Sequence, residues 1–393
     1  MKRRDFLKQS ALATVGTYFI PSFLKAFNQG KNNFNNKKLV IIQLSGGNDG
    51  LNTIIPFEND LYYQARPRLA IPKTEVIKLS DNLGLHPAME KFQLLFKENL
   101  VSILNNVGYP NPDRSHFRSM DIWHTASESN EYLHTGWIGR LLDAQCQNNC
   151  QAFNAIEVDD TLSLALKGDK TKGLALREPE KFYKMAQRKQ FDYLGTKQED
   201  NIDYLYKTLS ETHNSAAYIY EKNKIKKQNN TEYPNDDFAQ RLKIIAQMIH
   251  SGIETSIYYV SLSGFDTHTN QENTQKRLLS VYSEAIYSFV TDLKAKQNLD
   301  NTLILTFSEF GRRVEENASG GTDHGTANNL FIIGNSLKKT GFYNNQANLS
   351  DLDGGDIKYS IDFRNIYATL LKKHLTLDDA KILNRRFEYL DFI

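Results

Sequence analysis

Three polar motifs lie close together in the last third of the chain: FDTHTN at 265–270, FSEFGRR at 307–313 and GTDHGTANN at 321–329. Each motif sets a carboxylate or a histidine beside glycine, threonine or asparagine. Carboxylate oxygens and neutral imidazoles bind divalent ions such as Zn, Mn and Mg, so the motifs together could form a metal site. The same residue types also favour turns and helix caps, which gives each motif alone an ordinary structural explanation.

Short apolar runs predict the strands that would carry these motifs. The runs are rich in β-branched residues and apolar on both faces, which is typical of buried parallel strands. Helical patterns at 86–98, 237–252 and 275–296 lie between them, and the second of these ends at Gly252, a natural helix stop. The alternation predicts an α/β fold with a doubly wound, mostly parallel sheet and helices on both faces. The predicted strands span residues 37–45, 100–107, 256–263, 301–308 and 329–334.

The carboxyl ends of these strands are expected to place the polar motifs close together. In an open α/β sheet, ligands bind just beyond the carboxyl ends of the strands. We therefore expect five side chains to share one edge of the sheet and to bind one or two divalent ions. Two ions about 4 Å apart could hold both the attacking and the leaving oxygen of a phosphoryl displacement. The five residues are Asp49 after the first strand, Asp266 and His268 after the third, Glu309 after the fourth, and His324 just before the fifth.

The segment GYPNPDRSHFRS follows the second predicted strand and places Ser115 at the expected start of a helix. A hydroxyl beside metal ions ionises more easily, and a helix N-terminus attracts anions, so Ser115 is the candidate nucleophile. Arg114 or Arg118 could hold anionic oxygens through paired hydrogen bonds. The residues that could contact a substrate are Asn48, Arg114, His116, Arg118 and Arg312.

The first 27 residues have the layout of an export signal. A basic start precedes a moderately apolar stretch, and Arg3 with Arg4 resembles the twin-arginine signal. We expect delivery to the periplasm or cell envelope by the twin-arginine export machinery. No clear Ala-x-Ala cleavage site follows, which leaves membrane anchoring by an uncleaved signal open. The alternative is a basic amphipathic helix at the start of a cytosolic domain.

The rest of the chain divides into an Asn-rich linker at 28–37 and an α/β domain at 38–393. Residues 151–235 interrupt the strand and helix rhythm, and we interpret them as a helical insertion or cap. Cys146 and Cys150 are too few for a zinc site and could form a small loop disulfide or stay unpaired. With 48 basic and 46 acidic residues the net charge is +2, so no nucleic acid partner is expected.

A series of motifs resembles a known family over residues 38–375, nearly the whole chain after the signal. The motifs are GGNDGLNTIIP, RSHFRSMDIWHTA, TGWIGRLL, GFDTHTNQ, TFSEFGRR, GGTDHGTANNLFIIG and DFRNIYATLL. They resemble the exported proteins catalogued as domain-of-unknown-function family fifteen hundred and one. That family is similar in turn to the alkaline phosphatase and sulfatase superfamily of metal-dependent ester hydrolases. The resemblance implies an alkaline-phosphatase-like fold and hydrolysis of phosphate or sulfate esters.

The resemblance also implies roles for individual residues. Ser115 would be the nucleophile, and Asp49 with Glu309 would form one of two metal sites. Alkaline phosphatases usually have Asp-His where this chain has Glu309-Phe310, so this site lacks an expected imidazole. The segment RSHFR lacks the proline of the sulfatase motif, which disfavours sulfatase activity. The other metal site would consist of Asp266, His268 and His324.

Two functional hypotheses follow from these observations. The first is an exported metal-dependent hydrolase that acts on a small-molecule or polymer ester through Ser115. The second is a non-catalytic exported binding or assembly protein that retains the fold, and the Glu309-Phe310 departure favours it. A metal-free serine hydrolase is disfavoured, because the chain has no Gly-x-Ser-x-Gly elbow.

Overall fold

The computed structural model describes residues 36–146, 154–188, 215–222 and 231–393. The predicted export signal, most of the linker and Cys150 lie outside these ranges. Cys146 is disulfide-bonded. Within the described ranges, no helix combines the length and the apolar character needed to cross a membrane.

A nine-stranded sheet forms the centre of the domain, in the order β11-β5-β10-β9-β1-β8-β6-β7, with β14 also pairing with β5. All five runs predicted as strands lie in it. They correspond to β1 (Lys38–Ser45), β5 (Val101–Gly108), β8 (Ile257–Ser263), β9 (Thr302–Phe307) and β10 (Asn328–Ile333).

Strand direction agrees with the expected mostly parallel sheet, with β10 as a reversed strand. β1 pairs in parallel with β8 and β9, whereas β10 is antiparallel to both β9 and β5. The connection from β9 to β10 contains no helix, and a parallel crossover usually needs one. β10 is nevertheless buried on both faces like its neighbours, so its apolar composition carries no information about its direction.

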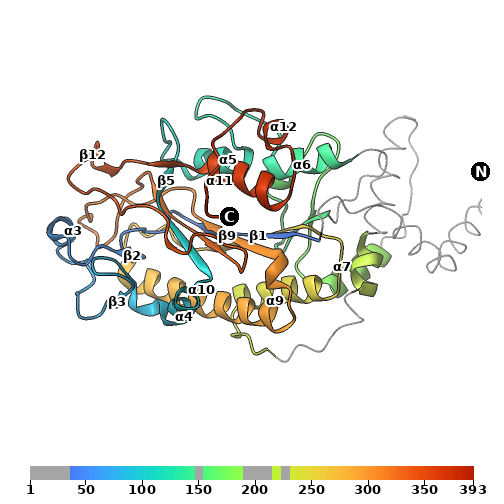
Figure 1. Ribbon diagram of the computed structural model, residues 1–393, viewed down its shortest axis with the longest axis horizontal. Helices are drawn as coiled ribbons and strands as arrows, with labels where there is room; N and C mark the ends of the chain where they lie inside the picture. The colour runs from blue at the N-terminus through green and yellow to red at the C-terminus, as the bar shows by residue number, and fades with distance from the viewer. Residues whose placement is uncertain (1–35, 147–153, 189–214, 223–230) are drawn as a thin grey trace, which may run out of the picture. The chain divides into compact units, whose positions relative to one another are not determined.

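Helices cover both faces of the sheet, as predicted (Figure 1). In the view of Figure 1, α4 (Glu90–Lys97), α9 (Asp237–His250) and α10 (Gln271–Ala295) lie below the sheet. Above it lie α5 (His116–Thr125), α6 (Trp137–Gln145) and α11 (Phe363–Thr369). The helical patterns at 86–98, 237–252 and 275–296 are therefore confirmed.

Apolar packing fixes the two helices that matter most for the candidate site. α10 buries Leu279, Tyr282 and Ile286, which recur every three or four residues on one helix face. On the opposite side of the sheet, Trp123 of α5 stacks on Phe307 of β9 with ring centroids 4.6 Å apart. Burial of each large apolar side chain contributes roughly 1.5–3 kcal/mol, so these contacts hold α5 against the end of β9.

Part of the stretch predicted as an insertion belongs to the sheet. β6 (Ala155–Glu157) pairs in parallel with β8, and β7 (Leu174–Ala175) pairs with β6. The helix α7 (Pro179–Arg188) follows, and residues 215–222 are also helical. Residues 151–153, 189–214 and 223–230 of this stretch lie outside the described ranges.

Short elements complete the domain. Three strands, β2 (Ile54–Ile55), β3 (Ile77–Lys78) and β4 (Gly84–Leu85), form a small antiparallel sheet. A hairpin consists of β12 (Leu352–Asp353) and β13 (Asp356–Ile357). The others are α3 (Asp60–Ala65), η1 (Pro87–Met89), η3 (Leu164–Leu166), η4 (Leu299–Asn301), β11 (Gly341–Phe342), β14 (Ile361–Asp362), η5 (Leu370–His374) and α12 (Asp379–Leu383).

Candidate metal centre

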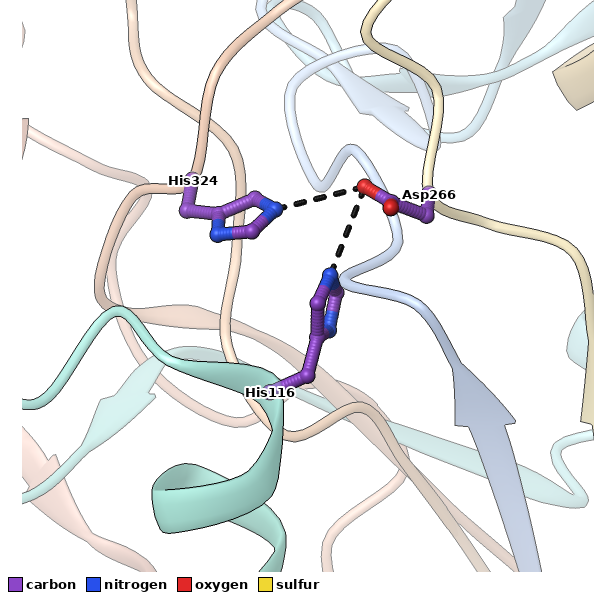
Figure 2. A group of neighbouring side chains, drawn as sticks. All are labelled: His116, Asp266 and His324. Atoms are coloured by element: carbon purple, nitrogen blue, oxygen red, sulfur yellow. Dashed lines mark hydrogen bonds and ion pairs between the residues drawn. The ribbon is translucent and has the colours of Figure 1, made fainter.

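Side chains from three separate segments converge on the carboxylate of Asp266. His116 at the start of α5 and His324 in the loop before β10 both point toward it (Figure 2). One ligand atom from each of these three residues lies within 4.8 Å of the other two. The Nε2 atoms of His116 and His324 are 3.4 and 3.2 Å from Asp266 Oδ1. The structure thus brings together residues that are more than 200 positions apart in the sequence.

His268 adds a fourth donor to this group. Its Nε2 atom lies 3.1 Å from Asp266 Oδ1 and 2.9 Å from His324 Nε2. A cation bound at 2.0–2.2 Å would hold two of its ligand atoms about 3.0 Å apart at right angles and about 3.4 Å apart at the tetrahedral angle. The triangle of Asp266, His268 and His324 has edges of this size. These three residues are therefore spaced like ligands of one ion.

The second ring nitrogen of each histidine is committed to an oxygen. An oxygen acceptor at Nδ1 requires the proton to be there, which leaves a lone pair on Nε2, the arrangement that metal-binding histidines adopt. The Nε2 lone pairs of His268 and His324 then face each other, which is unfavourable without a cation or a proton between them. The Nδ1 pairs are His116 with Glu309 Oε1 at 3.0 Å, His268 with Asp323 Oδ1 at 3.1 Å, and His324 with the Arg114 carbonyl at 2.7 Å.

Arg312 fixes the position and the charge of Asp266. Its buried guanidinium donates to Asp266 Oδ1 at 2.8 Å and to the Phe265 carbonyl at 2.9 Å. Further hydrogen bonds to the carbonyls of Gly47 (2.7 Å) and Thr322 (2.9 Å) join the loops after β1 and before β10. Burial acts to raise the pKa of Asp266, but the hydrogen bonds from Arg312 and His324 and the charges of Arg312 and His116 together outweigh it, and the pKa falls to about 2. Asp266 is thus ionised at neutral pH, as a metal ligand must be.

Glu309, predicted as a metal ligand, reaches the group through His116. Its buried carboxylate accepts from the backbone N–H of Gly46 at 2.8 Å and from His116 Nδ1 at 3.0 Å. The bond to Glu309 raises the pKa of His116, whereas burial lowers the pKa of His324. Phe310 packs against both imidazoles, with its ring centroid 4.8 Å from each. Glu309 and Phe310 together hold His116 against the group.

Asp49 lies outside this group of donors. One of its oxygens is 2.5 Å from Arg66 Nη1 and also accepts from the Gln271 amide. The other oxygen accepts from the backbone N–H of Leu51 at 3.1 Å. Both Asp49 and Arg66 are fully buried, so a guanidinium supplies the cation that faces Asp49. The sequence analysis did not predict Arg66 and Gln271 as partners of Asp49. The general rule that a buried carboxylate needs a cationic partner indicates that such a residue exists, but not which one it is.

Besides Arg312, two more of the residues predicted to contact a substrate are engaged in structural contacts. The Arg118 guanidinium donates to backbone carbonyls, including those of Glu128 (3.0 Å) and Glu131 (2.6 Å), and is 4.0 Å from the Tyr132 ring centroid. The Asn48 side chain is buried and bonds to the Thr53 hydroxyl at 3.0 Å. Both side chains organise loops at the sheet edge.

Arg114 and Ser115 remain accessible beside the group. Arg114 is about half exposed, pairs with Asp356, and offers its carbonyl to His324. Ser115 is exposed at the N-cap of α5, and its side chain makes no capping bond. Its backbone N–H donates to Asp113 Oδ1 at 2.7 Å. The Ser115 hydroxyl is therefore uncommitted among the described residues, between two neighbours that both contact the candidate centre.

The chain belongs to the family described as Protein of unknown function (DUF1501), which matches residues 36–388. This confirms the family that the sequence motifs indicated. A search of curated proteins finds no match.

Several solved structures are similar to the chain at low sequence identity. The C-terminal periplasmic domain of EcEptC from Escherichia coli shares 10% identity, covers 92% of each chain and has a TM-score of 0.40. The PsFucS1 sulfatase from Pseudoalteromonas sp. shares 13% identity over 94% of this chain and 73% of its own, with a TM-score of 0.40. The phosphonate monoester hydrolase SpPMH from Silicibacter pomeroyi shares 9% identity over 78% and 69%, with a TM-score of 0.38.

Proposed function

We propose that this family member is an exported hydrolase of phosphate or related esters that uses one divalent ion. Asp266, His268 and His324 would bind the ion. The observation that carries the proposal is the convergence of their Oδ1 and Nε2 atoms at 2.9–3.2 Å, with both Nδ1 atoms committed to oxygens. Two imidazoles and one carboxylate favour Zn or Mn over Mg, which prefers oxygen ligands.

One ion is favoured over two by the contacts of Asp49 and Glu309. Asp49 is neutralised by Arg66, and Glu309 is satisfied by His116 and the Gly46 N–H. Neither carboxylate needs a second cation. When bound, the single ion would act as a Lewis acid that polarises a phosphoryl oxygen and stabilises developing negative charge.

Ser115 is proposed as the nucleophile and His116 as its base. The Oγ–P bond would form as the bond from phosphorus to the leaving oxygen breaks, with the hydroxyl proton passing through His116 Nε2 to the leaving group. Water would then cleave the phosphoserine, pass a proton back through His116 to Ser115 Oγ, and release phosphate. His116 is proposed for this role because it follows Ser115 directly in the chain and because its Nε2 atom, 3.4 Å from Asp266 Oδ1, makes no hydrogen bond to the described residues. The N-terminus of α5 would attract the anionic substrate.

Export is a separate part of the proposal and rests on the sequence of residues 1–27. Arg3 and Arg4 would direct the folded protein to the twin-arginine machinery and so to the periplasm or cell envelope. The signal could remain attached as a membrane anchor.

A second candidate function is a non-catalytic binding or assembly protein that retains the ion. The observation that favours it is the engagement of Arg118 and Arg312 in bonds to backbone carbonyls. An ester hydrolase needs cationic groups to hold the anionic part of its substrate, and these two arginines are not free to supply them.

A hydrolysis screen with Ser115→Ala distinguishes the two candidates. Phosphate monoesters, phosphate diesters and sulfate monoesters would be tested with Zn, Mn, Mg and Ca. The hydrolase proposal expects Ser115→Ala to lower turnover by about 10³-fold or more while the metal content stays unchanged. Ser280→Ala, which removes a hydroxyl from the surface of α10, is the matched control. If the metal-loaded protein hydrolyses no ester in the screen, the hydrolase proposal is wrong and the binding function is supported.

A further inference from the structure

Two neighbouring cavities extend away from the candidate centre. The first has a volume of about 440 Å³ and begins at Phe310, whose ring lies against the imidazoles of His116 and His324. The second has a volume of about 450 Å³ and is lined by Asn106, by residues 343–346, 348 and 351, and by residues 358–361. Lys358 and Tyr359 line both cavities, so the two lie on either side of these side chains. We call the pair the Tyr359 groove.

Five of the eleven residues that line the second cavity carry side-chain amides. Asn345 is exposed, and its side-chain amide has no hydrogen-bond partner in the described part of the chain. Gln346 and Asn348 also line this cavity. Asn106 uses its Nδ2 atom on the Asn345 carbonyl at 3.3 Å, which leaves its Oδ1 atom available. Each amide offers both donors and acceptors, which complements sugar hydroxyls, since a hydroxyl also donates and accepts.

Tyr359 supplies an aromatic surface that lines both cavities. It is 41% exposed, although a large aromatic side chain gains free energy by burial. The flat face of an aromatic ring can cover the C–H face of a sugar ring, while amides contact the hydroxyls at the sugar's edge. Aromatic and amide groups are therefore arranged in the groove as an oligosaccharide would require.

The charge of the groove argues against a polyanionic ligand. Lys358 pairs with Asp351, and Asp353 also borders the first cavity. A polyanion would need an excess of Lys and Arg along its path, which the described lining lacks. A neutral stretch of sugars requires no such excess.

We infer that the Tyr359 groove binds a neutral oligosaccharide segment, so that the ester cleaved at the centre is carried on a glycan. The second half of this inference rests on the proposed hydrolase function, whereas glycan binding itself does not. A chain of sugars would run from Phe310 past Tyr359 to the amides of Asn345 and Gln346. The groove would thereby select glycan esters over small esters.

Calorimetric titration of the full chain with maltohexaose, cellohexaose, xylohexaose and chitohexaose tests the binding. We expect at least one of these glycans to bind with a dissociation constant below about 1 mM. Tyr359→Ala and Asn345→Ala should each weaken that binding by about tenfold. Tyr389→Ala removes another exposed tyrosine, at 48% exposure, and should bind like the wild type.

The outcome separates this inference from the proposed hydrolysis. His324→Ala, which removes a proposed metal ligand, should still bind the glycan, because the groove does not need the ion. If the protein binds a glycan but hydrolyses no ester, the groove assignment stands and the hydrolase proposal is wrong. Absence of binding to all four glycans, or equal binding by wild type and Tyr359→Ala, overturns the groove assignment even if small esters are hydrolysed.

Discussion

Asp49 and Arg66 form an ion pair with 2.5 Å between their atoms, and their side chains are 1% and 0% exposed. A buried ion pair of this kind is costly to break, because the remaining charge has no partner and no water. It also means that Asp49 already has a cation. Removal of Asp49 should therefore lower the free energy of unfolding without lowering the number of bound metal ions. Both quantities can be measured on the same variant.

Replacement of Asp49 by Ala should leave one metal ion per chain and destabilise the protein by about 3–5 kcal/mol. Metal analysis and denaturant unfolding measure the two quantities. Glu58→Ala is the matched control, because Glu58 pairs with Lys73 at a surface where both are about half exposed and a pair contributes at most about 1 kcal/mol. Loss of metal from Asp49→Ala with an intact fold would identify Asp49 as a ligand after all.

The strand ends were predictable from sequence because strands and helices leave a local pattern. β1, β8 and β9 are short apolar runs between helical patterns, so Asp266 and His268 could be placed at one sheet edge. The antiparallel direction of β10 could not be predicted, because its residues are apolar on both faces like those of the parallel strands. The partner of Asp49 was equally hidden, because Arg66 comes from the C-cap of the short helix α3, where no periodic pattern exists.

The hydrogen-bond partners of the arginines could not be predicted from the sequence either. Arg118 and Arg312 look like free cations in the sequence, yet both guanidinium groups bond to backbone carbonyls of loops, which follow α5 directly for Arg118 and lie far away in the sequence for Arg312. Those carbonyls are positioned by the folded chain, and backbone acceptors have no signature in the identity of neighbouring residues. Distinguishing an arginine that binds a ligand from one that stabilises a loop therefore required the structure.

Glu157 at the end of β6 should make stability depend on pH. Burial raises its pKa to about 7 from the usual 4.5, although the Ser163 N–H at 2.7 Å opposes this. Between pH 4.5 and 7 the unfolded chain has released this proton while the folded protein keeps it, so stability falls as pH rises through this window. Glu157→Gln removes the loss, on the order of 2–3 kcal/mol at pH 7.5 relative to pH 4.5. Urea unfolding across this range measures it, and a stability difference between the two proteins that stays constant with pH would contradict the buried neutral acid.

Export should depend on the guanidinium groups of Arg3 and Arg4 and not on positive charge alone. The two side chains present planar donor groups that lysine cannot reproduce, so replacement of both by lysine is expected to retain the protein in the cytoplasm. Cell fractionation with immunodetection measures the distribution. Lys2→Arg, which keeps the pair and the charge, is the control and should be exported normally. Periplasmic delivery of the double lysine variant at the wild-type level would refute the twin-arginine assignment.

The roles of His268 and His116 should separate when metal content and turnover are measured on the same variants. His268 Nε2 completes the triangle with Asp266 and His324, so His268→Ala should lose the ion and, with it, turnover. Asp323→Asn weakens only the acceptor at His268 Nδ1 and should cost about 10–100-fold in metal affinity. His116→Ala should keep the ion and lose turnover, because His116 is proposed to move a proton. His124→Ala, a buried histidine bonded to Gln43 away from these ligands, controls for loss of an imidazole. If His116→Ala loses the ion while His268→Ala retains it, His116 is the third ligand, and the proton must be carried by another group.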